Sequence, residues 1–323
     1  MATITEPSRA RSSASAVRRP VDLNRIVTFV NVVEAGSFTG AATRLGVPKS
    51  SISRGVSHLE EELGTRLLQR TTRKLMLTDA GRAYYERARV HLSALEDATN
   101  EVSDMGRDPR GTVRVTAPVD IGTALLADLV TRFVKKHPTI RVELSLTSRR
   151  VDLVAEGFDV AVRAGNLEDS TLIVRRIAMS ALALFAAPAY LRKHGTPRTV
   201  ADLADHDLVM FRTHNQAVLR LVGPDGPEEV SVRGPIEADE LGFVHAAVVA
   251  GAGVGLLPTF LCATDCHADK AKRTVRVLPH HTVPASPINV VVPSTRQEPA
   301  RVTVFREFLV AELSKVQWGD EGR

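Results

Sequence analysis

The chain has 323 residues, of which 44% are hydrophobic and 24% charged, a balance typical of soluble globular proteins that excludes a mostly disordered chain and a collagen. Only two cysteines are present, which excludes a disulfide-stapled miniprotein and favours a reducing compartment. Lys and Arg number 42 against 37 Asp and Glu, a net charge of +5 that is compatible with a polyanionic partner without requiring one. The sequence has no run of 18 or more apolar residues, so it predicts no membrane-spanning helix, and we expect no membrane partner.

Residues 1–20 carry four arginines and no apolar run, so they do not resemble a secretory signal. Their Arg and Ser content is faintly similar to an organelle transit peptide. The preferred interpretation is a solvated, disordered arm.

Residues 21–78 predict three short helices and a hairpin. Asp22 can cap a helix that ends at Gly36, and Ser37 or Thr39 can cap a second helix that ends at Gly46. A third helix starts after Pro48, with apolar residues at helical spacing up to Gly64. The basic stretch 66–77 fits a small hairpin.

A long helix is predicted over 79–105, capped by Thr78, and the linker 79–110 ends at Gly106, Pro109 and Gly111. One face of this helix carries an apolar stripe with steps of three and four, namely Tyr84, Ala88, Leu92, Leu95, Ala98 or Thr99, Val102 and Met105. Because no neighbouring segment could cover so long a stripe, we expect it to pair with a second copy of the chain.

From residue 111 onward, predicted strands alternate with helices, which indicates an α/β domain with mostly parallel sheets. The expected strands are 113–116, 142–146, 160–162, 174–185, 208–211, 230–232, 254–257, 275–278 and 288–292. The expected helices are 125–136, 151–156, 243–249 and 300–316. The basic excess lies before this domain, since residues 1–110 hold 17 Lys and Arg against 13 Asp and Glu.

Residues 38–57 have the pattern of a helix-turn-helix: a small, alanine-rich helix, a turn at Gly46, and a second helix that starts with short polar and basic side chains. Such side chains allow close approach to the major groove, while Arg and Lys can pair with guanine or phosphate. The candidate DNA contacts in this motif are Ser37, Thr39, Lys49, Ser50, Ser51, Ser53 and Arg54. Those in the hairpin, which would act as a wing on the DNA backbone, are Arg70, Thr71, Thr72, Arg73 and Lys74. The alternative is an ordinary helical bundle with a solvated basic face.

Four segments in fixed order resemble the N-terminal region of LysR-type transcriptional regulators: Phe29–Leu45, Ser51–Arg54, Leu59–Arg73 and Leu77–Gly81. Ala187–Leu191 and Ala250–Pro258 resemble the effector domain of the same family. One departure is Pro48-Lys49, where many members have Ser-Gln; a lysine here favours guanine or phosphate over adenine.

The resemblance implies an α/β protein overall: an N-terminal winged helix-turn-helix (21–78), a dimerisation helix (79–110), and a two-lobed domain like a periplasmic binding protein (111–316). Lobe 1 would comprise 111–184 and 287–316, lobe 2 would comprise 185–286, and 317–323 would be a tail. The implied function is sequence-specific regulation of transcription, modulated by a small-molecule effector. The implied partners are operator DNA, further copies of the chain up to a tetramer, and RNA polymerase, in the cytoplasm and at the nucleoid.

The effector would bind between the lobes, at the carboxyl ends of strands. The candidate residues there are Thr116, Ala117, Pro118, Ser148, Arg163, Ala164, Gly165, Met210 and Asp239. Arg163 suits a carboxylate, or else forms a surface salt bridge. Asp239 or Glu240 suits a hydroxyl or an amine, so the polarity of the ligand stays open.

Three further patterns suggest other functions. Gly251–Gly255 resembles a dinucleotide loop but follows a helix and precedes a strand, the reverse of the order that such loops need. Cys262, Cys266 and His267, with His280 and His281, could form a metal or redox site, although two cysteines at this spacing are more often packing residues. No nucleophile motif or phosphate loop appears, so we expect no enzyme, cofactor or metal. The alternative function is a dimeric metabolite-binding protein or enzyme whose N-terminal helices do not bind DNA.

Overall fold

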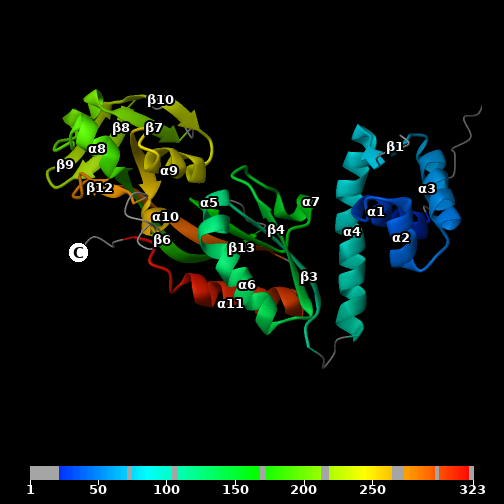
Figure 1. The fold of residues 1–323 in the computed structure, drawn as a ribbon. Helices are drawn as coiled ribbons and strands as arrows, with labels where there is room; N and C mark the ends of the chain where they lie inside the picture. The colour runs from blue at the N-terminus through cyan, green and yellow to red at the C-terminus, as the bar shows by residue number, and fades with distance from the viewer. Residues whose placement is uncertain are drawn as a thin grey trace, which may run out of the picture. The chain divides into compact units, whose positions relative to one another are not determined.

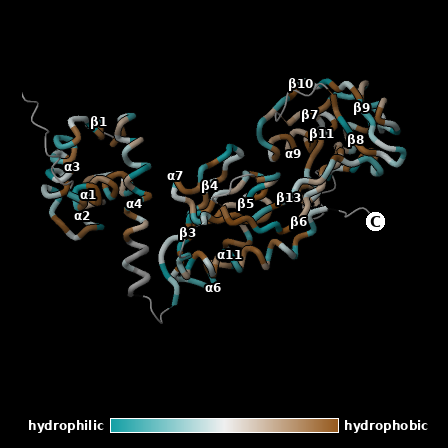
Figure 2. Tube along the Cα trace, turned by 180° about the vertical axis from the view of Figure 1, so that it is seen from behind, coloured by the Kyte–Doolittle hydropathy of each residue, from teal (hydrophilic) through white to brown (hydrophobic). Residues whose placement is uncertain are grey.

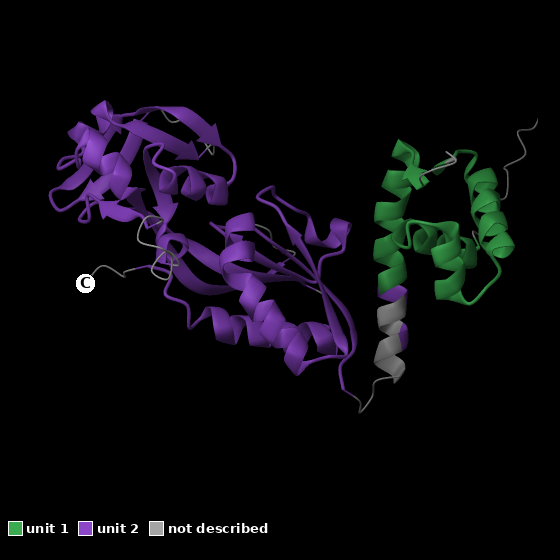
Figure 3. Ribbon diagram, in the orientation of Figure 1, with its two compact units in different colours: residues 1–93 green, residues 94–323 purple. Residues whose placement is uncertain are grey.

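A computed structural model describes residues 22–70, 75–103, 108–167, 172–211, 218–263, 273–294 and 298–319. The chain divides into two compact units, residues 1–93 and 94–323 (Figure 3). The division falls inside the long helix, so the predicted linker 79–110 is not a unit of its own. The predicted arm 1–20 lies outside the described residues. Within the described chain, no helix is both long and apolar enough to cross a membrane.

The first unit has the predicted order of three helices, a hairpin and a long helix (Figure 1). Its elements are α1 (Leu23–Glu34), α2 (Phe38–Leu45), α3 (Lys49–Leu63), β1 (Leu68–Arg70), β2 (Leu75–Leu77) and α4 (Asp79–Ser103). The side chain of Asp22 accepts a hydrogen bond from the amide of Asn24, and Gly46 and Gly64 end α2 and α3 in the left-handed conformation that glycine favours. These three predictions are confirmed.

The core of this unit forms where α1 and α3 cross. Phe29, Ile52 and Leu59 are at most 1% exposed, and the rings of Phe29 and Tyr84 lie 5.9 Å apart. Burying side chains of this size stabilises the unit by about 1.5–3 kcal/mol each. The recognition helix predicted from the sequence, α3, is therefore fixed along its apolar face.

The stripe on α4 is only partly available to a second copy. Tyr84, Ala88 and Leu92 pack on the core of the first unit, whereas Leu95 is 52% exposed. The expectation that no segment of the same chain could cover this stripe was wrong for its first half, because α4 folds back along the preceding helices. Met105, together with the side chains of Ala98 and Val102, lies outside the described residues.

The second unit contains a nine-stranded mixed sheet in the order β10-β7-β11-β6-β13-β5-β3-β4, with β12 also paired to β6. The strands are β3 (Gly111–Ala117), β4 (Ile140–Leu146), β5 (Val160–Ala164), β6 (Leu172–Ala186), β7 (Asp207–Phe211), β10 (Arg233–Ala238), β11 (Val254–Pro258), β12 (Val275–Val277) and β13 (Val283–Pro293). A separate hairpin is formed by β8 (Val218–Gly223) and β9 (Gly226–Ser231). The helices are α5 (Val119–Ile121), η1 (Gly122–Leu126), α6 (Ala127–Lys136), α7 (Leu153–Glu156), α8 (Pro188–His194), η2 (Ala201–Asp205), α9 (Leu241–Val249), α10 (Thr259–Ala263) and α11 (Ala300–Leu313).

Two long strands, β6 and β13, run antiparallel to each other through both lobes. On one side β13 pairs with β5, while β6 pairs with β11 and β12 on the other. The remaining pairings of the nine-stranded sheet are parallel, whereas the separate β8–β9 hairpin is antiparallel, which agrees with the predicted mostly parallel sheets. Figure 2 shows hydrophobic residues along α9 and α11, which cover the sheet.

Lobe 1 extends beyond the predicted boundaries. Trp318 is 5% exposed, and its ring lies 5.1 Å from that of Phe260 in α10. Both residues belong to the core of lobe 1, so the predicted tail packs on that lobe as far as Trp318. Helix α10, which the sequence analysis placed in lobe 2, contacts both lobes, because Phe260 lies in the lobe 1 core whereas Cys262 lies in a cluster with Val244 of lobe 2. The large apolar ring of a tryptophan is usually buried against other apolar side chains, and this is why Trp318 packs on the lobe and does not lie in a free tail.

The other differences concern short elements. Helix α11 ends at Leu313 and not at Val316, and α7 starts at Leu153. The sequence analysis did not predict α8, η2, β8, β10 or α10. Segments of five to seven residues hold too few apolar positions to show a period.

The start of α4 packs against the hairpin so closely that Gly81 has no room for a side chain. A Cβ atom there would lie 1.9 Å from the carbonyl oxygen of Leu67, which also accepts a hydrogen bond of 3.0 Å from the amide of Thr78. Gly81→Ala gains about 1 kcal/mol of helix propensity. We expect overpacking of about 1–3 kcal/mol or more to outweigh it.

Thermal unfolding of the full chain checks this expectation, with Arg82→Ala at the neighbouring exposed position as the control. The control should stay within about 0.5 kcal/mol of the parent protein. A Gly81→Ala protein as stable as the parent would show that the hairpin can move away from α4.

Candidate DNA interface and ligand cavity

The N-terminal half of α3 presents polar side chains to solvent while its other face is buried. Lys49, Ser50, Ser51 and Arg54 are exposed and Ser53 is half-buried, whereas Ile52 is 1% exposed. Positions 49 and 53, like positions 50 and 54, are one turn apart and share a face. The Nε atom of Arg54 donates a 3.4 Å hydrogen bond to the carbonyl of Ser50, so the guanidinium lies along this face.

The first turn of α3 is also suited to an anion. Pro48 precedes the helix and supplies no side-chain cap. The first amides of a helix have no partner within the helix and carry the positive end of its dipole. A phosphate oxygen can accept hydrogen bonds from them.

Ser37 and Thr39 stand at the start of α2. The hydroxyl oxygen of Ser37 accepts a 2.9 Å hydrogen bond from the amide of Gly40, so Ser37, and not Thr39, caps the helix. Thr39 is exposed. Both residues therefore lie at the surface, and Ser37 has a structural role as well.

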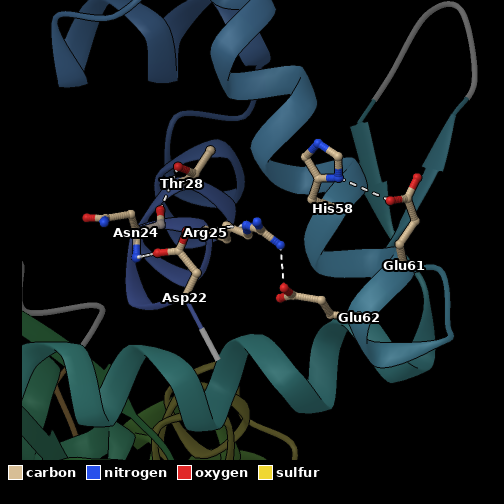
Figure 4. A network of polar contacts seen from close by, with 7 residues as sticks. All are labelled: Asp22, Asn24, Arg25, Thr28, His58, Glu61 and Glu62. Carbon is tan, nitrogen blue, oxygen red and sulfur yellow. Dashed lines mark hydrogen bonds and ion pairs between the residues drawn. The ribbon is translucent and has the colours of Figure 1, made fainter. Parts of the chain in front are cut away.

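Polar contacts hold α3 against α1 at its far end (Figure 4). Arg25 of α1 forms an ion pair with Glu62 of α3, and Asp22 accepts from Asn24 at the start of α1. Where the two helices cross, a Cβ on Gly55 would lie 3.2 Å from the Thr28 side chain. These contacts fix the direction in which the exposed face of α3 points.

The predicted wing is the hairpin β1–β2, in which Leu68 pairs with Leu77 and Arg70 with Leu75. Thr71, Thr72, Arg73 and Lys74, together with the side chain of Arg70, lie outside the described residues.

A cavity of about 950 Å³ lies between the lobes of the second unit. Six of the nine predicted effector residues line it: Pro118, Ser148, Arg163, Ala164, Gly165 and Met210. The other three do not. Thr116 and Ala117 are fully buried beneath it, and Asp239 is exposed to solvent.

Arg163 is the cation placed deepest in the cavity wall. Its Nη1 donates to the carbonyl of Thr147 (3.0 Å) and its Nη2 to Oγ1 of Thr116 (2.9 Å). Burial, and then the positive charge of Arg149, lower the pKa of Arg163, yet an arginine stays protonated at neutral pH. It is Arg149 that forms an ion pair with Glu156 at the surface, while the two hydrogen bonds of Arg163 go to neutral oxygens.

The loop after β5 holds Arg163 in place. Gly165 has a φ of +95°, its amide donates to the carbonyl of Pro287, and its carbonyl accepts from Nδ2 of Asn289. Asn289 is 4% exposed. Strand β13 therefore positions Gly165, and with it Arg163, which lies two residues earlier in the chain.

The sequence analysis missed two carboxyl groups that line the cavity, those of the buried Asp120 and the exposed Glu237. Asp120, at 5% exposure, lines the cavity. Burial raises its pKa, and the charge of Glu240 raises it further, while the amides of Ile121 and Asp120 lower it. An acid next to the predicted Thr116–Pro118 segment was the available signal. The apolar lining comes from strands and helices of both lobes, and it includes Leu182 of β6 and Phe211 at the end of β7.

The patterns that suggested other functions have structural roles where they are described. Gly251, at φ +85°, makes the turn between α9 and β11, in the order helix then strand, as the sequence predicted. Cys262 is 7% exposed in an apolar cluster. Nε2 of His281 lies 2.9 Å from Glu228. Cys266 and His267 lie outside the described residues, and those that are described hold no group of three potential metal ligands.

Comparison with known families matches both units. Residues 23–82 match the bacterial regulatory helix-turn-helix proteins of the lysR family, and residues 106–314 match the LysR substrate binding domain.

Individual relatives agree with this match. The transcriptional regulator CrgA of Neisseria meningitidis is 35% identical over 293 residues, 89% of this chain and 96% of the relative. The transcriptional activator AaeR of Escherichia coli is 35% identical over 237 residues, 73% of this chain and 77% of the relative.

Solved structures resemble the whole chain. That of CrgA has a TM-score of 0.58 at 32% identity and covers 91% of this chain and 99% of its own. The Vibrio cholerae virulence activator AphB has a TM-score of 0.60 at 29% identity, covering 90% and 99%.

One family match lies within the first unit (residues 23–82) and the other covers most of the second (residues 106–314), in the order that the resemblance implied. The chain belongs to the LysR-type family of DNA-binding transcriptional regulators, with an effector-binding domain in its second unit.

Proposed function

We propose that the exposed face at the start of α3 reads operator DNA in the major groove. The observation that carries this proposal is the face of Lys49, Ser50, Ser53 and Arg54 on a helix whose other side is fixed in a core. Lysine and arginine pair with guanine or phosphate, and the small serines let the helix approach the bases. Ser51 and the start of α2, with Ser37 and Thr39, contact the flanking backbone.

The wing adds sequence-independent affinity in this proposal. Arg70, Arg73 and Lys74 neutralise phosphates beside the groove, with Thr71 and Thr72 as hydrogen-bond donors. Each neutralised phosphate contributes about −0.9 to the slope of log affinity against log salt.

We further propose that the C-terminal half of α4, which carries the exposed Leu95, joins two chains and that effector domains join dimers into a tetramer. A pair of α3 helices related by a two-fold axis then contacts half-sites roughly 34–36 Å apart. A bound tetramer beside a promoter can contact RNA polymerase.

For the effector, we propose a small organic acid with an apolar body. The supporting observation is a half-buried arginine whose hydrogen bonds go to neutral oxygens, in a cavity with walls such as Leu182 and Phe211. An acid group can pair with Arg163 in bidentate geometry, and Asp120, whose pKa is raised, can donate a hydrogen bond in its neutral form. The ligand is bound and released unchanged, with no metal or cofactor, and it regulates DNA binding only if it binds two arrangements of the chain unequally.

Arg54→Ala should weaken operator binding because it removes a cation from the groove-facing side of α3. The expected loss is about 1–3 kcal/mol if Arg54 contacts a base. Fluorescence anisotropy with a DNA fragment from upstream of the protein's own gene measures it. Arg141→Ala is the matched control, since Arg141 is an exposed arginine of the second unit. Equal affinities of the two variants would remove Arg54 from the interface.

Leu95→Asp should break the dimer because it places a charge at an exposed apolar position of the α4 stripe. Leu23→Asp is the matched control, since Leu23 is 55% exposed and Leu95 52%. Sedimentation velocity should show a smaller species for the first variant only. Dimers that persist in the Leu95→Asp protein would place the interface elsewhere.

Arg163→Gln should abolish stabilisation by small organic acids. At a ligand concentration of 100 Kd, binding raises the stability of the parent protein by about 2.7 kcal/mol. Thermal shift with a panel of aliphatic and aromatic carboxylic acids, and with their neutral amides, tests this effect. Arg163→Lys keeps the positive charge but lacks the two parallel donors of a guanidinium, so this variant should bind the acids more weakly than the parent protein does. Amides that stabilise the parent protein as well as the acids do would contradict an anionic ligand.

A further inference from the structure

Helix α3 contains three consecutive glutamates whose side chains have different partners. Glu62 pairs with Arg25, and Glu61 lies 3.1 Å from Nδ1 of His58 and is exposed (Figure 4). Glu60, in contrast, is 8% exposed. Its Oε1 accepts hydrogen bonds from the amides of Leu67 (2.8 Å) and Leu68 (3.0 Å).

A carboxylate is costly to bury, and two amide donors on one oxygen offset that cost. These amides belong to the residues at the base of the wing, which are 1% and 3% exposed. Glu60 is therefore a direct polar connection from the recognition helix to the first strand of the wing.

The other side of the same segment is held by α4. The carbonyl of Leu67 accepts from the amide (3.0 Å) and the hydroxyl (3.2 Å) of Thr78, and that hydroxyl also donates to the carbonyl of Arg66 (2.7 Å). Gly81 touches the same carbonyl of Leu67. The base of the wing is thus held between α3, through Glu60, and the start of α4.

We propose that Glu60 is a positioning residue for DNA binding, which sets the wing in register with the recognition helix. The inference rests on the proposed function, in which both α3 and the wing contact the same duplex. Phosphate contacts from the wing add to those from α3 only when both fit one DNA geometry. Glu60 contributes through this alignment and does not touch DNA itself.

If Glu60 acted only through its charge, replacing it with a neutral residue would strengthen DNA binding, whereas a positioning role predicts weaker binding. Deleting a negative charge from a DNA-binding unit increases its attraction to phosphates. Glu61→Ala removes the same charge from the next position and leaves the wing untouched, so it should bind DNA as tightly as the parent protein or more tightly. Weaker binding by Glu60→Ala is therefore a signature of positioning.

The experiment is a double-mutant cycle in the full chain. It combines Glu60→Ala with a wing variant in which Arg73 and Lys74 are both replaced by Ala. Anisotropy measures affinity for the upstream DNA fragment and for an unrelated fragment at several salt concentrations. Thermal unfolding shows that each variant is folded, and Glu60→Gln, which keeps one acceptor oxygen, replaces Glu60→Ala if the latter is unfolded.

If Glu60 acts through the wing, its replacement should weaken binding about 10-fold or more and reduce the salt slope by about 1 to 2, as the wing variant does at −0.9 per phosphate. In the wing variant, the same replacement should change affinity less than about 2-fold, because neighbouring residues that act together are not additive. Glu60→Gln should bind between the parent protein and Glu60→Ala.

Two outcomes overturn the inference and can be told apart. Additive losses, or an unchanged salt slope in Glu60→Ala, would mean that Glu60 only stabilises the fold, while the proposed DNA interface stands. A wing variant that keeps the affinity and the salt slope of the parent protein would contradict the proposed wing contact itself, and the role of Glu60 with it.

Discussion

The antiparallel pairing of β6 and β13 is the constraint on which the second unit depends. These strands pass through both lobes, and the register of β13 against β5 places Ile288 opposite Ala164 and Asn289 opposite Arg163. The same strand therefore joins β5 of lobe 1 to β6, holds the loop at Gly165, and contributes Ile288 and Val291 to the cavity wall. Because any relative movement of the lobes must bend these two strands, the irregular pairings of β13 near Ser286 and Ile288 are where such bending costs least.

In the first unit the equivalent constraint is the tight packing around Leu67. Its amide is bound by Glu60 and its carbonyl by Thr78, and Gly81 leaves no space beside it. The end of α3, the base of the wing and the start of α4 thus meet at one residue. The apolar core orients α3, and these polar contacts orient the wing relative to it, so the two parts of the proposed DNA interface are set by different kinds of interaction.

Much of this arrangement was predictable from the sequence, because long periodic segments and glycine stops are read directly from the residues. Asp22, Gly46 and Gly64 fixed the bounds of the first helices, and the position of β6 followed from its apolar length. The residues that line the cavity were harder to predict. The ends of predicted strands show which edge of the sheet faces the cavity, but they do not show which side chains reach it. Thr116 is bound by Arg163 and Asp239 faces solvent, so neither lines the cavity. Asp120 does line it, although acidic residues are rarely buried in an apolar wall. Glu60 had no sequence signal that distinguished it from Glu61 and Glu62, since only tertiary contacts give the three different partners.

The division of the α4 stripe has a consequence for the evolution of such regulators. Tyr84, Ala88 and Leu92 are constrained by the core of their own DNA-binding unit, whereas Leu95 is 52% exposed. If chains pair through this end of α4, as proposed, substitutions at Leu95 change which chains associate without altering the core of the DNA-binding unit. Paralogues within one cell could then keep nearly identical winged helices and still avoid forming mixed dimers, because in this proposal partner choice depends on a separate stretch of the same helix.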